Sequence, residues 1–169
     1  MPIISGVAHD STESLATVRR VPNEPGMAAK VFTLLAEAGV NVDMIVQASA
    51  STGTADISFT VPGSAAAKVR DVLQEKQDEL GYQSFDIDAN VGKVAVVGVG
   101  MKTHSGLAAK FFNALSDEGV NVLMISTSEI RIAALVPLEQ LQDAVRALHT
   151  AYGLDAEQVE AVVYGGTGR

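Results

Sequence analysis

The hydrophobic and polar positions of this chain switch repeatedly between a period of about two, typical of strands, and a period of about 3.6, typical of helices. The clearest helical stretch is Met27–Ala38, which Gly39 follows as a candidate C-cap. The elements predicted in the first half are, in order, a strand, a helix, two strands, a helix and a strand: Leu15–Val21, Met27–Ala38, Asn41–Ala48, Ala55–Val61, Ala65–Leu80 and Tyr82–Ile87. The second half repeats this order: Lys93–Val99, Gly106–Glu118, Asn121–Ser126, Glu129–Val136, Leu138–Tyr152 and Val159–Tyr164.

The repetition is also visible in the residues themselves. Gly26–Ile45 and Gly106–Ile125 align without a gap, with twelve identities in twenty positions. The chain is therefore a tandem duplication, and each copy is predicted to form a βαββαβ unit. This order is typical of the ferredoxin-like α+β fold, an antiparallel sheet with two helices on one face. We expect a first unit over residues 1–90 and a second over 91–156, with the alternative that residues 157–169 supply the last strand of the first unit.

The composition restricts the partners and the chemistry. The 169 residues carry a net charge of -8, which disfavours a nucleic-acid partner. Cysteine is absent, the three histidines are scattered, and no set of residues suggests nucleophilic catalysis or a metal site. Gly98, Gly100 and Gly106 do not have the spacing of a dinucleotide-binding loop, so no cofactor is expected. With no apolar run long enough for a membrane span and no signal-peptide pattern, a cytoplasmic protein is expected.

The loop between the first strand and first helix is the best candidate site in each copy. It runs over Asn23–Ala28 in the first copy and Thr103–Ala108 in the second. Gly26 and Gly106 allow the backbone to pack closely, and the N–H groups that follow open a helix, where an anion such as an α-carboxylate is favoured. The alternative is that both glycines only permit a tight turn, and the motif alone favours this alternative.

Three amide side chains form a second set of candidates. Asn41 and Asn121 begin the second strand of each copy and could hold an ammonium group, or simply end the turn after the preceding glycine. Gln47 ends that strand in the first copy, and its amide both donates and accepts, as recognition of a hydroxyl requires. Taken singly, Gln47 fits a solvated surface position equally well.

The tandem units resemble paired ACT domains, which are small regulatory modules that bind amino acids. Four stretches resemble the regulatory region of bacterial aspartokinases more closely: Ile4–Ala8, Met101–Gly106, Ile125–Arg131 and Ala161–Arg169. The resemblance covers essentially the whole chain, and the sequence contains no Lys-Phe-Gly-Gly-Thr entry of an amino-acid-kinase domain. It implies a non-catalytic β subunit that forms a homodimer and joins a catalytic α subunit in an α2β2 aspartokinase.

The resemblance also implies an effector site between ACT units of two chains. One wall would come from residues of the first copy: Asn23, Gly26, Met27, Ala28 and Gln47. The other would come from the second copy of another chain: Gly119, Asn121 and Val122. Threonine is the implied ligand, with lysine as co-effector or alternative. Asn23 stands where the family often has Asp, and Ser105 where it often has Pro, and both departures weaken the case for lysine.

Two rival functions stay open on the sequence. The first is a stand-alone amino-acid-binding ACT protein that regulates another partner, and the second is a small ferredoxin-like enzyme. The resemblance further implies that the second ACT unit is inserted within the first, so that Val159–Tyr164 would complete the first unit's sheet.

Overall fold

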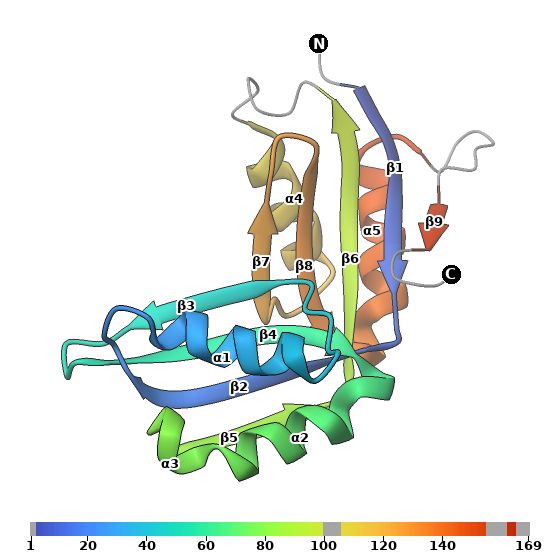
Figure 1. Cartoon of the computed structure of the whole chain (residues 1–169). Coiled ribbons are helices and arrows are strands. Elements are labelled where there is room, and N and C mark those ends of the chain that lie inside the picture. The colour runs from blue at the N-terminus through green and yellow to red at the C-terminus, as the bar shows by residue number, and fades with distance from the viewer. Residues whose placement is uncertain (1–2, 100–105, 155–161, 165–169) are drawn as a thin grey trace. The chain divides into compact units, whose positions relative to one another are not determined.

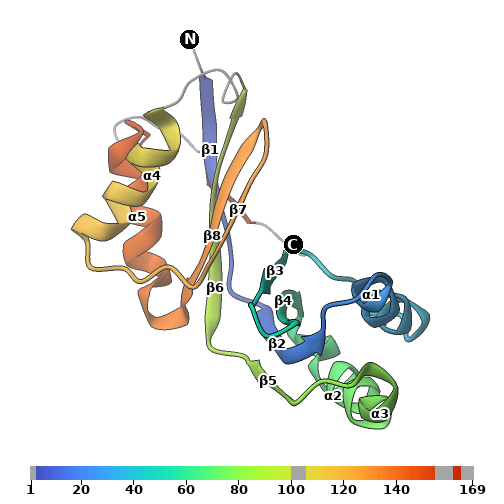
Figure 2. The same ribbon diagram turned by 90° about the vertical axis from the view of Figure 1, so that its left-hand side faces the viewer.

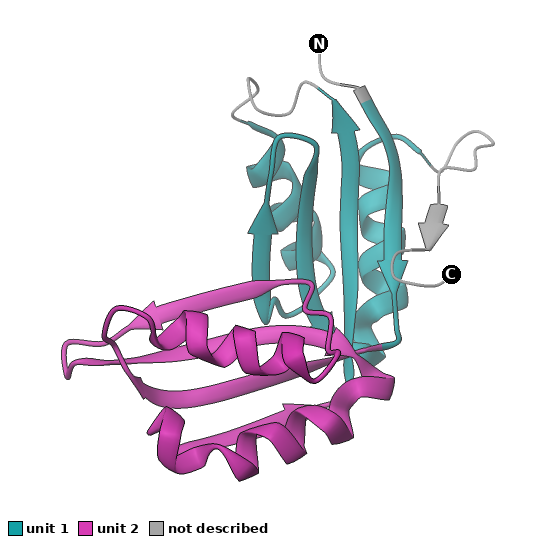
Figure 3. Cartoon of the chain, in the orientation of Figure 1, with its two compact units in different colours: residues 1–12, 90–169 teal, residues 13–89 magenta. Residues whose placement is uncertain are grey.

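The computed structural model describes residues 3–99, 106–154 and 162–164 (Figure 1). The chain divides into two compact units, coloured separately in Figure 3. Unit 1 combines residues 1–12 with residues 90–169, and unit 2 is the continuous segment 13–89. Within the described residues, no helix has both the length and the apolar character needed to cross a membrane.

Unit 2 has the predicted βαββαβ order. Its elements are β2 (Glu13–Pro22), α1 (Met27–Glu37), β3 (Ile45–Ser49), β4 (Thr54–Pro62), α2 (Ala66–Glu75), α3 (Gln77–Leu80) and β5 (Ser84–Asp88), with a 3-10 turn (Gly63–Ala65) before α2. The four strands form an antiparallel sheet in the order β3-β4-β2-β5, and the helices cover one of its faces (Figure 2). The expected α+β, ferredoxin-like arrangement is confirmed for this unit.

Unit 1 is built on the same plan but takes a strand from the beginning of the chain. Its elements are β1 (Ile3–Asp10), β6 (Val91–Val99), α4 (Gly106–Asp117), β7 (Met124–Thr127), β8 (Arg131–Pro137), a 3-10 turn (Leu138–Gln140), α5 (Leu141–Ala151) and β9 (Val162–Tyr164). The sheet order is β7-β8-β6-β1-β9, and α4 and α5 pack on one face (Figure 2). β1 lies antiparallel to β6, in the place that β5 occupies beside β2 in unit 2.

The nesting of the two units therefore differs from the expectation. The first copy is inserted between β1 and the second copy, and residues 1–12 belong to the second copy's sheet. β9 also joins this sheet and not that of the first copy, because it pairs with β1, in a parallel direction. β1 does not pair with β2, its neighbour in the sequence, but with β6. Its assignment depends on a contact between segments more than eighty residues apart, which local periodicity cannot reveal.

Some element ends also differ from the prediction. β3 begins at Ile45 and β7 at Met124, later than predicted, because the preceding residues cross from the helix to the sheet as irregular chain. The predicted helix Ala65–Leu80 is divided at Lys76, whose φ of -104° and ψ of 17° interrupt it before Gly81 ends α3. Part of the predicted last strand and the loop residues 100–105 lie outside the described residues.

Each unit has its own hydrophobic core between its sheet and its helices. Leu35 of α1 and Leu115 of α4, which are equivalent in the repeat, are both completely buried. Phe59 on β4 fills the core of unit 2, and Phe111 on α4 fills that of unit 1. The helical spacing found in the sequence is thus the pattern that aims each helix at its sheet.

Candidate functional site

A small cavity lies in unit 2 where the end of β2, the following loop, the start of α1 and the neighbouring strands meet. Its volume is about 100 Å³. It is lined by Val21, Pro22, Asn23, Glu24, Gly26, Met27, Ala28, Ala29, Gln47, Ala55 and Ile57. The structure therefore brings together all five residues of the wall that was expected from the first copy.

The start of α1 gives this cavity its polarity. Gly26 occupies the N-cap with a φ of +91°, a left-handed conformation that suits glycine, and no side chain caps the helix. The Met27 N–H donates to the Glu24 carbonyl at 3.2 Å, and the Lys30 N–H closes the first helical turn onto the Gly26 carbonyl at 2.9 Å. The N–H groups of Ala28 and Ala29 are then the donors that a helix start leaves without an intrahelical acceptor. Together with the helix dipole they favour a carboxylate.

Two amides complete the polar lining. The Asn23 backbone N–H donates to the Gly53 carbonyl at 3.0 Å, and its side-chain Nδ2 donates to the Ser49 hydroxyl at 3.2 Å. These bonds fix the loop to the β3–β4 hairpin and leave the Asn23 amide oxygen as an acceptor. Gln47 lies on the edge strand β3, is exposed, and has no hydrogen-bond partner among the described residues. Its amide is therefore available to a ligand both as donor and as acceptor.

Asn41 does not belong to this cavity. It follows the far end of α1, and an eleven-residue helix with a rise of about 1.5 Å per residue separates it from Gly26 by roughly 15 Å. Its side chain is exposed and lines no part of the cavity. Asn41 is therefore not one of the residues that line this cavity, and its role toward an effector ammonium group stays a prediction.

Gly119, Asn121 and Val122 lie at the corresponding place in unit 1, after the end of α4. A residue that the sequence did not single out, Gln140, holds this segment: its Nε2 donates to the Gly119 carbonyl at 3.1 Å, and its Oε1 accepts the Asn121 N–H at 2.8 Å. In the sequence, the signal is a difference between two turns: the turn after Pro137 ends in Gln140, whereas the turn after Pro62 ends in Ala65. The two turns are equivalent because both form a 3-10 turn directly before a helix.

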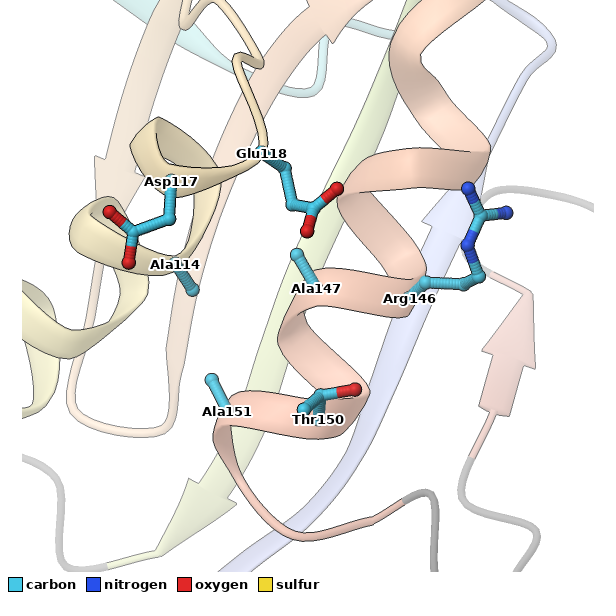
Figure 4. Close-up of a pocket in the computed structure, with 7 residues that line it drawn as sticks. All are labelled: Ala114, Asp117, Glu118, Arg146, Ala147, Thr150 and Ala151. Carbon is cyan, nitrogen blue, oxygen red and sulfur yellow. The ribbon is translucent and has the colours of Figure 1, made fainter.

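A larger hollow of about 410 Å³ lies in unit 1, between α4 and α5 (Figure 4). It is lined by Ala114, Asp117, Glu118, Arg146, Ala147, Thr150 and Ala151. The alanine side chains in its lining are short and leave space between the two helices. Figure 4 shows Glu118 reaching from the end of α4 toward α5. None of the predicted site residues lines this groove.

The titratable groups with shifted pKa values lie away from the cavity. Burial raises the pKa of Tyr152 to about 12, and its hydroxyl donates to the Leu107 carbonyl at 2.8 Å. Burial also raises the pKa of Tyr82, whose hydroxyl donates to the Leu73 carbonyl at 2.6 Å. Both tyrosines tie a chain segment to a helix. Among the described residues, no cluster of three His, Asp or Glu side chains could hold a metal ion.

Comparison with known proteins agrees with this geometry. The family model of the ACT domain matches twice, over residues 19–77 and 94–152. The two matches fall on the two copies of the repeat and cover the cavity wall, the Gly119–Val122 segment and Gln140.

The relatives are aspartokinases. The chain is 46% identical over 169 residues to the aspartokinase of Corynebacterium glutamicum and spans about 40% of the length of that relative. It is 42% identical to a chain in a crystal structure of aspartokinase alpha and beta subunits, with a TM-score of 0.84 over 89% of this chain and 99% of that one. The ligand-free regulatory subunit of aspartate kinase from Thermus thermophilus matches with 36% identity, the same TM-score and the same coverage. The chain therefore belongs to the ACT domain family and is homologous to the tandem-ACT regulatory subunits of aspartate kinases.

Proposed function

We propose that this chain binds threonine and so mediates feedback inhibition of an aspartokinase, which phosphorylates aspartate with ATP. The observation that carries the proposal is the cavity at the start of α1, where an uncapped helix and two amides surround a space of about 100 Å³. The effector carboxylate would meet the N–H groups of Ala28 and Ala29. The effector hydroxyl would meet the Gln47 amide.

The residue at position 23 favours threonine over lysine. Asn23 contributes a neutral amide, so this position offers no carboxylate to pair with a lysine ammonium group. The carboxylate among the residues that line the cavity is that of Glu24, which is exposed. Lysine remains in the proposal only as a co-effector.

We further propose that a second copy of this chain completes the site. β3 and β7 are edge strands, and each edge exposes large apolar side chains: Ile45 and Val46 in unit 2, Leu123 and Ile125 in unit 1. An exposed apolar edge strand is a template for pairing with another chain. The partner's copy of the Gly119–Val122 segment would then supply a carbonyl oxygen and the Asn121 amide to the effector ammonium group.

The regulatory effect would be a shift of population. An effector held between two chains stabilises the arrangement that contacts it on both sides. The size of the shift is set by the difference between the effector's affinity for this arrangement and its affinity for the alternatives. We propose that this arrangement belongs to the inhibited state of a catalytic α subunit. A relative of known structure contains aspartokinase alpha and beta subunits together, which supports such an assembly.

Calorimetric titration of the chain with the aspartate-family amino acids tests the proposal. Threonine should bind, the variant Gln47→Ala should bind it at least several-fold more weakly, and the control variant Gln74→Ala, on the exposed face of α2, should bind it normally. Analytical ultracentrifugation should show that threonine tightens the dimer. No heat with threonine, or an unchanged association constant, would reject the proposed function. Binding that leaves the kinase activity of a co-purified catalytic chain unchanged would favour a stand-alone binding protein.

A further inference from the structure

The Gln140 side chain forms a two-point bridge to the backbone after α4. Its amide donates to the carbonyl of Gly119 and accepts from the N–H of Asn121, at 3.1 and 2.8 Å. A primary amide offers a donor and an acceptor side by side, as this bridge requires. Gln140 is itself half-buried at the end of the 3-10 turn that precedes α5. The bridge therefore connects the exposed Gly119–Asn121 segment to a packed part of unit 1.

Unit 2 has the same backbone without the bridge. Gly39 and Gly119 both have left-handed conformations, with φ of +81° and +73°, and both helices end with the same hydrogen bonds after them. In unit 2, however, the equivalent of Gln140 is Ala65, which has no polar side chain. Within the described residues, neither the Gly39 carbonyl nor the Asn41 N–H has a hydrogen-bond partner. The bridge is thus a feature of unit 1 and not a requirement of the fold.

We infer that Gln140 is a positioning residue for the effector site, which it serves by holding the Gly119–Val122 segment in one arrangement. This inference rests on the proposed function, in which that segment meets the ligand in the cavity of a second copy. An exposed segment that contains a glycine loses conformational entropy when it is ordered, and a segment ordered in advance does not add that cost to binding.

The bridge is compatible with a direct role of the same backbone in binding. A carbonyl oxygen has two lone pairs, so the Gly119 carbonyl can accept from Gln140 and from a ligand ammonium group together. The Asn121 backbone N–H is occupied by Gln140, which leaves the Asn121 side-chain amide as the group that faces a ligand. Gln140 would therefore not touch the effector and would act through Asn121 and Gly119.

The variants Gln140→Ala and Gln140→Glu test this role, with Gln142→Ala on the exposed face of α5 as the matched control. Loss of the bridge should weaken threonine binding roughly threefold to tenfold, which corresponds to one or two ordinary hydrogen bonds. Gln142→Ala should bind as the unaltered chain does. Hydrogen exchange of the Asn121 amide should be faster in Gln140→Ala and unchanged in the control.

The Gln140→Glu variant adds a readout that a merely structural role would not move. An ionised glutamate can accept the Asn121 N–H but has no proton to donate to the Gly119 carbonyl, whereas a protonated one can do both. The affinity of the Gln140→Glu variant for threonine, relative to that of the unaltered chain, should therefore be low at about pH 7.5. It should recover as the pH falls toward about 4.3, the ordinary pKa of glutamate.

The outcomes separate this inference from the function on which it rests. If the unaltered chain does not bind threonine, the proposed function fails and the effector role of Gln140 fails with it. If the unaltered chain binds and Gln140→Ala binds equally well, the inference is overturned while the proposed function stands. If a variant binds threonine more weakly only because it is partly unfolded, its melting temperature will be lowered. The exchange rate of the Asn121 amide, measured at a temperature where the variant is folded, then decides whether the bridge exists.

Discussion

Both units have a core of apolar side chains, but the completely buried phenylalanine lies on a strand in unit 2 and on a helix in unit 1. In unit 2 the helix contributes Val31 and the strand β4 contributes Phe59, whereas in unit 1 the helix contributes Phe111 and the equivalent position of β8 is Ala134. The strand pairings establish this equivalence, because Phe59 is opposite Ile45 and Ala134 is opposite Ile125. All four side chains are almost completely buried. The difference teaches that a large ring can enter these duplicated cores either from the strand or from the helix, so the identity of each core position was not conserved.

The rims of the units differ more than their cores. At the start of α1, unit 2 has a cavity lined by an uncapped helix and two amides. After α4, unit 1 has a backbone segment held by Gln140, whereas in unit 2 the same backbone groups have no hydrogen-bond partner among the described residues. The two rims therefore differ in the way that the proposed function requires of two unlike walls.

The largest expected effect comes from removing the aromatic side chain of one core. Phe59→Ala should lower the free energy of unfolding by about 3–5 kcal/mol, because the ring is completely buried, packs edge-on against Phe32 of α1, and would leave a cavity in the core. Urea denaturation followed by far-ultraviolet circular dichroism measures the change. A loss below about 1 kcal/mol would show that the core of unit 2 does not depend on this ring.

A second variant tests the exchange directly. Adding Val31→Phe to Phe59→Ala gives unit 2 the arrangement of unit 1, and should recover about 1–2 kcal/mol of the loss by refilling the space from the helix. Val31→Phe alone should cost about 1–3 kcal/mol because it overfills the same core. The same denaturation experiment provides all three values. A double variant no more stable than Phe59→Ala would mean that the two positions do not share one volume.

Smaller effects are expected from the two tyrosine hydroxyls that bond to helix carbonyls. Tyr82→Phe and Tyr152→Phe should each cost about 0.5–1.5 kcal/mol, the usual contribution of one hydrogen bond. Tyr82 is the more buried of the two, so its loss should be the larger. The melting temperatures of the two variants measure both losses of stability. A larger decrease for Tyr152→Phe than for Tyr82→Phe would contradict this expectation.

The smallest expected effect is a pH dependence confined to unit 1, since segment 13–89 contains no histidine. The pKa of His9 is lowered from 6.5 chiefly by burial; Asp10 opposes this and the neighbouring His149 adds to it. The unfolded chain therefore takes up the proton first as the pH falls, so this contribution to stability is present above pH 6.5 and is lost below it. Urea midpoints at about pH 7.5 and about pH 5.5 should differ less in His9→Gln than in the unaltered chain. An equal difference in both would exclude His9 as the source.

Much of the fold and one wall of the candidate site could be predicted from the sequence. The repeat and the helical spacing gave both units, and the loop with Gly26 gave the start of α1, since these signals depend on near neighbours in the chain. Gln140 was missed because its bridge joins residues about twenty positions apart, a relation that has no local signature.

What the sequence determined by itself is the βαββαβ order of the first copy, the helices and central strands of the second, and the chemistry of the loop that opens α1, because hydrophobic period, turn glycines and helix starts are local properties. Only the tertiary structure decided that β1 and β9 join the sheet of the second copy, and that the core aromatic ring comes from a strand in one unit and a helix in the other. A sheet edge accepts any strand of suitable length, and a core accepts any arrangement that fills its volume. The choice is therefore made by contacts between distant segments, which a reading of neighbouring residues does not contain.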